Sequence, residues 1–228
     1  MKLLSRTKQQ GFTLIELLVV IGILAILLAI TLIAINPNKH FQDSRNTQRS
    51  SNVSEILNAI YEYESANNGN QPASVSGLSL VMPLGKAPTQ SATSTTFASS
   101  QVTYTGLTGN TVTSGNVLVT GCSDTADNGT FAVASGDATT IVVSNASGVA
   151  SATGCQIKSA VDVCADLAPA YIADLPVDPT SGSVTGASTP CNASTTAYNT
   201  GYTISQSNNR FTISAPTAEG GATISVTR

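Results

Sequence analysis

The sequence predicts an α+β protein in which a long, kinked N-terminal helix carries a C-terminal globular head built on an antiparallel β-sheet. Two observations support this fold class. An apolar run near the N-terminus is long enough to form one uninterrupted helix. The rest of the chain instead contains short β-like runs separated by Gly, Asn and Ser. The length of 228 residues allows one domain with appendages or two small domains.

The apolar run extends from Leu17 to Ile35. Fourteen of its 19 residues are Leu, Ile or Val, and the others are Ala, Gly or Thr. A helix of this length spans roughly 28 Å, close to the hydrocarbon thickness of a bilayer. A buried core helix and a cleaved secretory signal are the alternatives. The run is apolar on every face, is too long for a signal sequence and precedes no A-x-A cleavage site, so we expect a membrane-spanning helix.

The helix is expected to continue beyond this run. Pro37 disfavours helix in the residue before it and suits a first helical turn, so the helix should kink or restart at that point. A stripe with helical spacing then predicts one buried face, and it consists of Val53, Ile56, Leu57, Ile60 and Tyr61. Asn67 to Gly69 should end the helix, with Gly69 as its C-terminal cap. The result is a kinked helix from about Phe12 to Ala66.

We therefore divide the chain into four segments. Residues 1–11 are a basic leader, 12–36 the hydrophobic transmembrane helix, 37–66 its amphipathic continuation and 67–228 an extracellular β-rich head with disulfides. Within the head, the predicted strands are Val102–Thr105, Val117–Thr120, Thr130–Ala134, Thr139–Val143, Gly201–Ser205, Phe211–Ala215 and Thr223–Thr227.

The last three of these strands are predicted to form an antiparallel meander, with Asn208-Asn209 in a tight turn. The spacing of apolar residues within Ser159–Ile172 predicts a short helix, although Pro169 is unfavourable there. Lys86–Ser100 and Thr180–Thr200 are predicted to be exposed loops because they are rich in Gly, Ser and Thr.

The basic residues on the two sides of the apolar run do not decide its orientation, but the cysteines do. Cys122, Cys155, Cys164 and Cys191 all follow the membrane segment, and their spacing fits no zinc motif. An even number of cysteines in such a head indicates two disulfides and an oxidising compartment. Three pairings are possible, of which we favour Cys122–Cys155 with Cys164–Cys191.

Composition excludes several classes of protein. The net charge is −3 and charged residues make up 10% of the chain. Direct nucleic-acid binding is not expected, because nonspecific affinity comes from Lys and Arg on phosphates. The single histidine is His40, and no nucleophile elbow or P-loop is present, so we do not expect an enzyme.

The junction before the apolar run is more specific than the run itself. The residues read Gly11-Phe12-Thr13-Leu14-Ile15-Glu16-Leu17-Leu18-Val19-Val20. Glu16 places a carboxylate one turn into a membrane helix, where such a group is costly and marks a functional site. No Lys or Arg lies between Lys8 and Lys39. The string resembles the N-terminus of type IV pilins and pseudopilins.

This resemblance implies a processing and assembly pathway. A membrane prepilin peptidase would cut between Gly11 and Phe12 and methylate the new amino group of Phe12. The subunit would wait in the cytoplasmic membrane with its head outside. An inner-membrane assembly platform would then add it to a helical filament of copies of itself and other pilins. Glu16 would meet the Phe12 amino group of a neighbour.

A second resemblance covers Tyr171 to Pro179, which contains the Leu-Pro-x-Asp-Pro stretch found before the C-terminal sheet of major pseudopilins. In that family a calcium site lies downstream. Asp174 and Asp178 are the residues here that could contribute to one, but the sequence continues without the family's aromatic and acidic residues. We favour a rigid loop in which Asp178 makes a local turn, and expect no metal or cofactor. Asp124, Asp127 and Asn128-Gly129 form another acidic turn whose spacing is not that of an EF-hand.

The leading functional hypothesis is a structural subunit of a type IV pilus-like filament used in adhesion, motility or DNA uptake. A pseudopilin of a type II secretion or competence system is the alternative, with a periplasmic or envelope location. The cysteine-bearing head favours the pilin, because major pseudopilins tend to have small heads without disulfides. An anchored extracellular binding module that does not polymerise is the hypothesis from another class, and it would require neither Gly11 nor Glu16.

Overall fold

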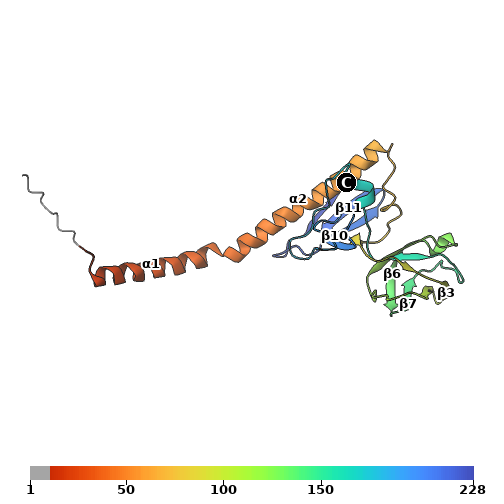
Figure 1. Cartoon of the computed structure of the whole chain (residues 1–228), viewed down its shortest axis with the longest axis horizontal. Helices are drawn as coiled ribbons and strands as arrows, with labels where there is room; N and C mark the ends of the chain where they lie inside the picture. Colours follow the sequence, from red (N-terminus) through yellow and green to blue (C-terminus); the bar gives the residue numbers. More distant parts are fainter. Residues whose placement is uncertain (1–10) are drawn as a thin grey trace, which may run out of the picture. The chain divides into compact units, whose positions relative to one another are not determined.

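The structure is a computed structural model that describes residues 11–228 (Figure 1). The leader predicted over residues 1–11, including its basic residues Lys2, Arg6 and Lys8, lies outside the described residues except for Gly11. The chain divides into two compact units, the first ending at Ser44 and the second running from Arg45 to Arg228.

The first unit contains helix α1 (Leu14–Ile35) and the beginning of helix α2 (Pro37–Ala66). Asn36 separates the two helices in a left-handed conformation, with φ at 45°. Asn tolerates this conformation better than most residues. Pro37 is the first residue of α2, the position where its fixed φ suits a helix and its missing N–H costs nothing. The predicted restart of the helix at Asn36-Pro37 is therefore confirmed.

Helix α2 continues into the second unit, where its apolar stripe packs in the core of the head. Val53, Ile56 and Ile60 are fully buried and Leu57 is 1% exposed. The helix ends at Ala66, and the N–H of Gly69, with φ at 81°, donates to the carbonyl of Glu64 at 2.7 Å. The predicted buried face and C-terminal cap are both present.

A five-stranded antiparallel sheet shares this core with α2. Its order is β1-β10-β11-β12, and β9 pairs with β10. The strands are β1 (Met82–Lys86), β9 (Ser183–Thr185), β10 (Ala197–Ser207), β11 (Arg210–Ala215) and β12 (Ile224–Thr227). Asn208 and Asn209 both have positive φ, at 50° and 62°, and join β10 to β11 in a tight hairpin. The predicted meander of the last three strands is confirmed.

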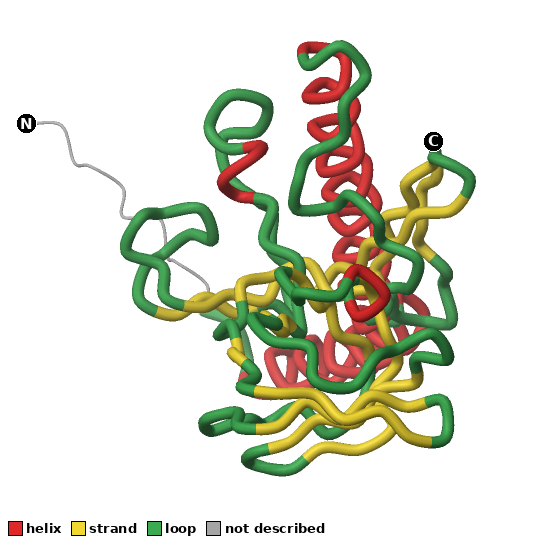
Figure 2. Tube along the Cα trace, turned by 90° about the vertical axis from the view of Figure 1, so that its right-hand side faces the viewer, coloured by secondary structure: helices red, strands yellow, loops and turns green. Residues whose placement is uncertain are grey.

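A second sheet of seven strands has a core of its own, and the sequence did not predict this division of the head. Its order is β2-β8-β5-β6-β7-β4-β3. The strands are β2 (Gln90–Ser91), β3 (Ser94–Ala98), β4 (Gln101–Thr105), β5 (Asn116–Thr120), β6 (Gly129–Gly136), β7 (Thr140–Ser144) and β8 (Gln156–Lys158). Val102, Tyr104, Val119, Ile141 and Val143 are fully buried between its strands and loops. Figure 2 shows the strands (yellow) and the long loops (green) that connect them.

Two local predictions were wrong. Lys86–Ser100 is not an exposed loop, because it contains β2 and β3, and Thr95 of β3 is 2% exposed. Thr180–Thr200 contains β9 and the start of β10. The short helix predicted within Ser159–Ile172 is present as the single turn α3 (Cys164–Leu167). Pro169 lacks the N–H that a longer helix would need.

Candidate functional site

The N-terminal end of α1 is organised by a capping box between Thr13 and Glu16. The Glu16 carboxylate oxygen Oε2 accepts hydrogen bonds from the Thr13 backbone N–H at 2.8 Å and from its hydroxyl at 2.7 Å. In return, the Thr13 hydroxyl oxygen accepts from the Glu16 N–H at 3.3 Å. Such a reciprocal pair satisfies two N–H groups that a helix start otherwise leaves free. The carboxylate is thereby held at the first turn of the helix.

The surface of α1 is apolar apart from Glu16 and Thr31, and the rest of its unit does not cover it. Every described side chain of the helix is exposed, and Phe12, just before it, is 88% exposed. The span Leu14–Leu32 is long and apolar enough to cross a membrane. Phe12, Ile15, Glu16, Val19 and Val20 line a shallow, largely apolar hollow at its N-terminal end. Glu16 therefore lies on a surface suited to lipid or to other apolar helices, and its hydrogen bonds to Thr13 stay within the start of its own helix.

A second charged cluster lies inside the head and was not predicted. The Arg49 guanidinium on α2 contacts the Asp178 carboxylate, with Nε 2.6 Å from Oδ2 and Nη2 3.3 Å from Oδ1. Nη2 also donates to the Thr180 hydroxyl at 2.7 Å. Nη1 donates to Asn46 Oδ1 at 3.0 Å and to Glu219 Oε2 at 2.9 Å. All the N–H groups of this buried guanidinium can therefore have acceptors, which is what a buried charge requires.

Glu219 extends the cluster towards the surface. Its carboxylate accepts two hydrogen bonds at 2.6 Å from the half-buried Arg45, in a bidentate arrangement. The Asn46 side chain donates to the Glu219 carbonyl at 2.9 Å and accepts from its N–H at 3.0 Å. The cluster thus ties α2 to the connection between β11 and β12 and, through Asp178, to the loop before β9.

The cluster shifts the protonation equilibria of its members. Burial alone would raise the pKa of Asp178, but hydrogen bonds from Arg49, Thr180 and Ser181 outweigh burial and hold that pKa well below its usual range. Hydrogen bonds from Arg45 and Arg49 lower the pKa of Glu219 to about 2. The hydrogen bond to Asp178 raises the pKa of Arg49. All these groups are therefore charged at neutral pH.

The sequence contained one signal for Arg49 that we did not use. Arg49 precedes Asn52, Val53 and Ile56 by three, four and seven residues, so it continues the buried stripe by one turn. An arginine on a buried stripe requires a buried acceptor. The structure supplies Asp178, and only the fold brings the two together.

The candidate calcium residues have other roles. Asp178 makes the predicted local turn, because its Oδ1 accepts from the N–H groups of Thr180 and Ser181 at 2.8 and 2.9 Å. Asp174 Oδ1 accepts from the N–H groups of Leu175 and Cys191 at 2.8 and 2.9 Å. Within residues 11–228, no group of three or more His, Cys, Asp or Glu residues is arranged to hold a metal ion.

The head contains the two disulfides that we favoured, Cys122–Cys155 and Cys164–Cys191. The first belongs to the core of the seven-stranded sheet, where Cys155 is fully buried and Cys122 is 8% exposed. The second lies beside the five-stranded sheet and is half-buried. Each sheet therefore has one covalent link next to its own core.

Comparison with known proteins identifies the N-terminal region. Residues 6–32 match the family model described as the prokaryotic N-terminal methylation motif, which is the signature of type IV pilins and pseudopilins. This signature implies processing by a prepilin peptidase and assembly into filaments in general, and its family is structural rather than catalytic. Together with the apolar α1, it fits a membrane-anchored precursor. No curated protein and no solved structure matches the chain.

Proposed function

We propose, from the N-terminal methylation motif and the exposed apolar helix that carries it, that this chain is a structural subunit of a type IV pilus-like filament. The observation that carries the proposal is the surface of α1, which is apolar on every face apart from the single carboxylate of Glu16. Residues 12–36 would be the membrane-spanning and filament-core segment, 37–66 its continuation and 67–228 the exposed head.

Cleavage between Gly11 and Phe12 would change the chemistry around Glu16. It creates an ammonium group at Phe12, which stays positively charged after methylation. It also removes Lys2, Arg6 and Lys8, so that the formal net charge changes from −3 to −6. A carboxylate in an apolar surrounding is costly when unpaired and much less so when paired with a cation.

Assembly would use this pair between subunits. Glu16 of one subunit would contact the Phe12 ammonium of a neighbour as the α1 helices leave the membrane and bundle in the filament. A polar pair in an apolar bundle also sets axial register, as a buried polar residue does in a coiled coil. Copies of the chain and other pilins are the partners of this contact, and an inner-membrane assembly platform would perform the extraction.

The head favours a surface pilus over a secretion or competence pseudopilus. It contains two sheets, each with a disulfide beside its core. Disulfides suit an oxidising environment outside the cytoplasm, and a weakly charged, hydroxyl-rich head suits an exposed filament. The mature subunit would then pass from the cytoplasmic membrane to the cell surface.

Mass spectrometry of the native protein tests the proposal. The intact mass and the N-terminal peptide should show a chain that begins with a methylated Phe12. Gly11→Ala is the test variant, because it changes the residue before the cleavage site. Gly22→Ala is the matched control, because it makes the same substitution within α1 at a position with open space around it. Processing should be lost in the first variant and kept in the second. A retained leader in wild-type protein, or cleavage beyond the apolar run, would contradict the filament hypothesis.

A further inference from the structure

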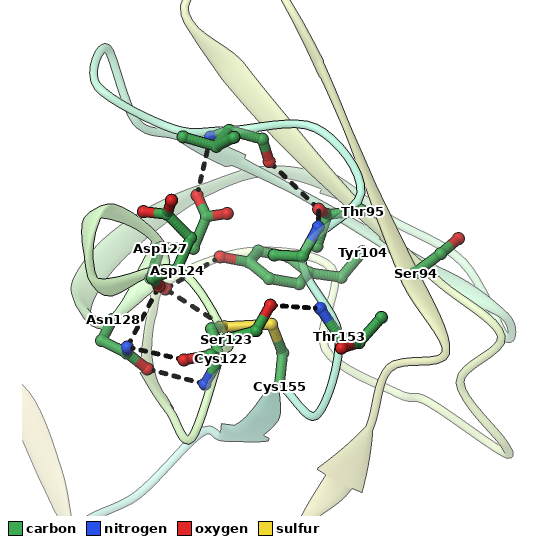
Figure 3. The surroundings of a disulfide bond; sticks show 12 residues. Ser94, Thr95, Tyr104, Cys122, Ser123, Asp124, Asp127, Asn128, Thr153 and Cys155 are labelled. Atoms are coloured by element: carbon green, nitrogen blue, oxygen red, sulfur yellow. Dashed lines mark hydrogen bonds between the residues drawn. A yellow bond between two sulfur atoms is a disulfide. The ribbon is translucent and has the colours of Figure 1, made fainter.

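A buried carboxylic acid lies beside the Cys122–Cys155 disulfide, at the short 3₁₀ turn η1 (Thr125–Asp127) (Figure 3). The turn follows β5 and leads into β6. Asp124 caps it by accepting a hydrogen bond from the Ala126 N–H at 2.9 Å. Asp127 is fully buried, although it is the last residue of a surface turn.

The two carboxyl oxygens of Asp127 differ in their surroundings. Oδ1 accepts from Asn145 Nδ2 and from the Val149 N–H, both at 3.2 Å. Oδ2 is buried and finds no hydrogen-bond partner among residues 11–228. Most buried polar atoms in folded proteins are paired, so an unpaired carboxyl oxygen requires an explanation.

The segment from Asn145 to Val149 packs closely against this carboxyl group. Asn145 Nδ2 also donates to the Ala126 carbonyl at 2.9 Å, which joins the segment to the turn a second time. A Cβ atom at Gly148 would lie 2.1 Å from Val102 Cγ2 and 3.0 Å from Asp127 Oδ1. The backbone can approach the acid this closely because residue 148 is glycine.

The groups around Asp127 provide no positive charge. The titratable groups that face it, within the part of the chain that the structure describes, are the Asp124 carboxylate on its own turn and the Tyr104 hydroxyl on β4. The Tyr104 hydroxyl donates to the Asp127 main-chain carbonyl at 3.2 Å and not to its carboxyl group. The neighbouring cysteines form a disulfide and do not titrate. An ionised Asp127 would thus be a buried anion without a counter-ion, with a second carboxylate nearby.

We propose that Asp127 is an uncharged carboxylic acid in the folded head and acts as a pH-sensitive latch between the η1 turn and the segment Asn145–Val149. In the acid form the group is accommodated without a counter-ion. Ionisation would place an unpaired charge in the core of the seven-stranded sheet, a change that is strongly unfavourable unless the turn or the segment opens to water.

The pKa of Asp127 has the direction that the latch requires. Burial raises it above the ordinary aspartate value, the nearby Asp124 charge raises it further, and the Val149 N–H opposes both. The folded state therefore keeps the proton at pH values where the unfolded chain has released it. Stability conferred by the acid form is complete below the ordinary aspartate pKa and is lost as the pH rises through the higher pKa of the folded state.

The test compares Asp127→Asn with wild type, using the full chain in a non-ionic detergent. Asn keeps the shape and the Oδ1 acceptor but cannot ionise. Calorimetry between about pH 4 and about pH 8 should show wild-type Tm falling relative to the variant, with the variant roughly 2–4 °C higher at the upper end. Asp124→Asn, which neutralises the partly exposed neighbour, should leave a smaller pH dependence of the Tm without abolishing it.

Two outcomes would overturn the latch. One is a wild-type Tm that rises relative to the variant as the pH increases, which would mean that the ionised Asp127 stabilises the fold. The other is a wild-type Tm at neutral pH that rises with added CaCl₂ and a variant that does not respond, which would make Asp127 a cation ligand. A ¹³C NMR titration of the Asp127 carboxyl carbon in wild-type protein keeps the proposal testable if the variant does not fold, because its chemical shift should report a pKa above the ordinary aspartate value.

Discussion

The Arg49 guanidinium and the Asp178 carboxylate are in contact inside the head, with Nε 2.6 Å from Oδ2 and neither side chain exposed. The pair joins α2, the continuation of the apolar helix, to a loop more than a hundred residues later in the sequence. This ion pair is therefore one of the contacts that attach α2 to the β-rich part of the head.

Breaking the Arg49–Asp178 pair should destabilise the head strongly. Arg49→Ala leaves a buried carboxylate without its counter-ion, and such a change typically costs about 3–5 kcal/mol. Urea denaturation of the full chain in detergent measures the effect. Arg45→Ala is the matched control, because Arg45 contacts Glu219 from a partly exposed position and its loss should cost much less. If the two variants lose equal amounts of unfolding free energy, burial does not make the Arg49–Asp178 pair more important than the partly exposed Arg45–Glu219 pair.

Acid should destabilise the head through the carboxylates of the same cluster. Hydrogen bonds from Arg45 and Arg49 lower the pKa of Glu219 to about 2 in the folded state, from an ordinary value of 4.5. A lowered pKa means that the stabilisation is present above the unfolded pKa and is lost as the pH falls from about 4.5 to about 2. Urea midpoints measured over this range should fall less steeply in Glu219→Gln than in wild type. If the urea midpoints of the two proteins fall in parallel with pH, Glu219 does not contribute to the acid sensitivity of the head.

Removal of metal ions should leave the stability of the head unchanged. Both oxygens of Asp178 are occupied by Arg49 and by donors of the following turn, and Asp174 binds backbone N–H groups. A guanidinium already supplies the positive charge that a cation would bring. Thermal unfolding with EDTA and with excess CaCl₂ should give the same Tm, and a shift that Asp178→Asn removes would place a metal ion in the loop.

The two disulfides should differ in their accessibility to reductant. Cys164–Cys191 is half-buried, whereas Cys155 is fully buried in the core of the seven-stranded sheet. Mild reduction of native protein, followed by alkylation and peptide mapping, should label Cys164 and Cys191 first. Loss of either bond should cost about 3–4 kcal/mol, because loops of this length restrict the unfolded chain comparably. Simultaneous labelling of all four cysteines would indicate unfolding before reduction.

Glu16→Ala should prevent filament assembly and leave membrane insertion intact. The change removes the only charge of α1, so the subunit should insert at least as well as wild type and accumulate in the membrane fraction. Electron microscopy of sheared surface fractions, with immunoblots of membranes, measures both effects. Glu55→Ala removes an exposed glutamate of α2 and provides the matched control. If the chain is an anchored binding module, neither change should affect its function. A normal filament yield from Glu16→Ala would contradict the assembly role of Glu16.

The sequence by itself determined the features that depend on neighbouring residues. Thr13 and Glu16 form their capping box within one helical turn, and Pro37 starts the second helix because its own ring prescribes the backbone. Asn208 and Asn209 adopt the left-handed conformations of the β10–β11 hairpin because asparagine tolerates positive φ better than most residues. The apolar run, the Glu16 carboxylate before it and the buried stripe of α2 could likewise be predicted from the sequence, because the helical period determines which residues share a face.

Only the tertiary structure decided which distant residues meet. It divided the head into two sheets. It also formed β3 in a segment that is too polar to predict as a strand, because β4 provides the backbone hydrogen-bond partners of that segment. It also brought Asp178 and Glu219 to Arg49. Beside the Cys122–Cys155 disulfide, it left one oxygen of Asp127 without a hydrogen-bond partner among the residues that the structure describes. A buried charge depends on the groups that the fold assembles around it, and residues far apart in the chain supply those groups.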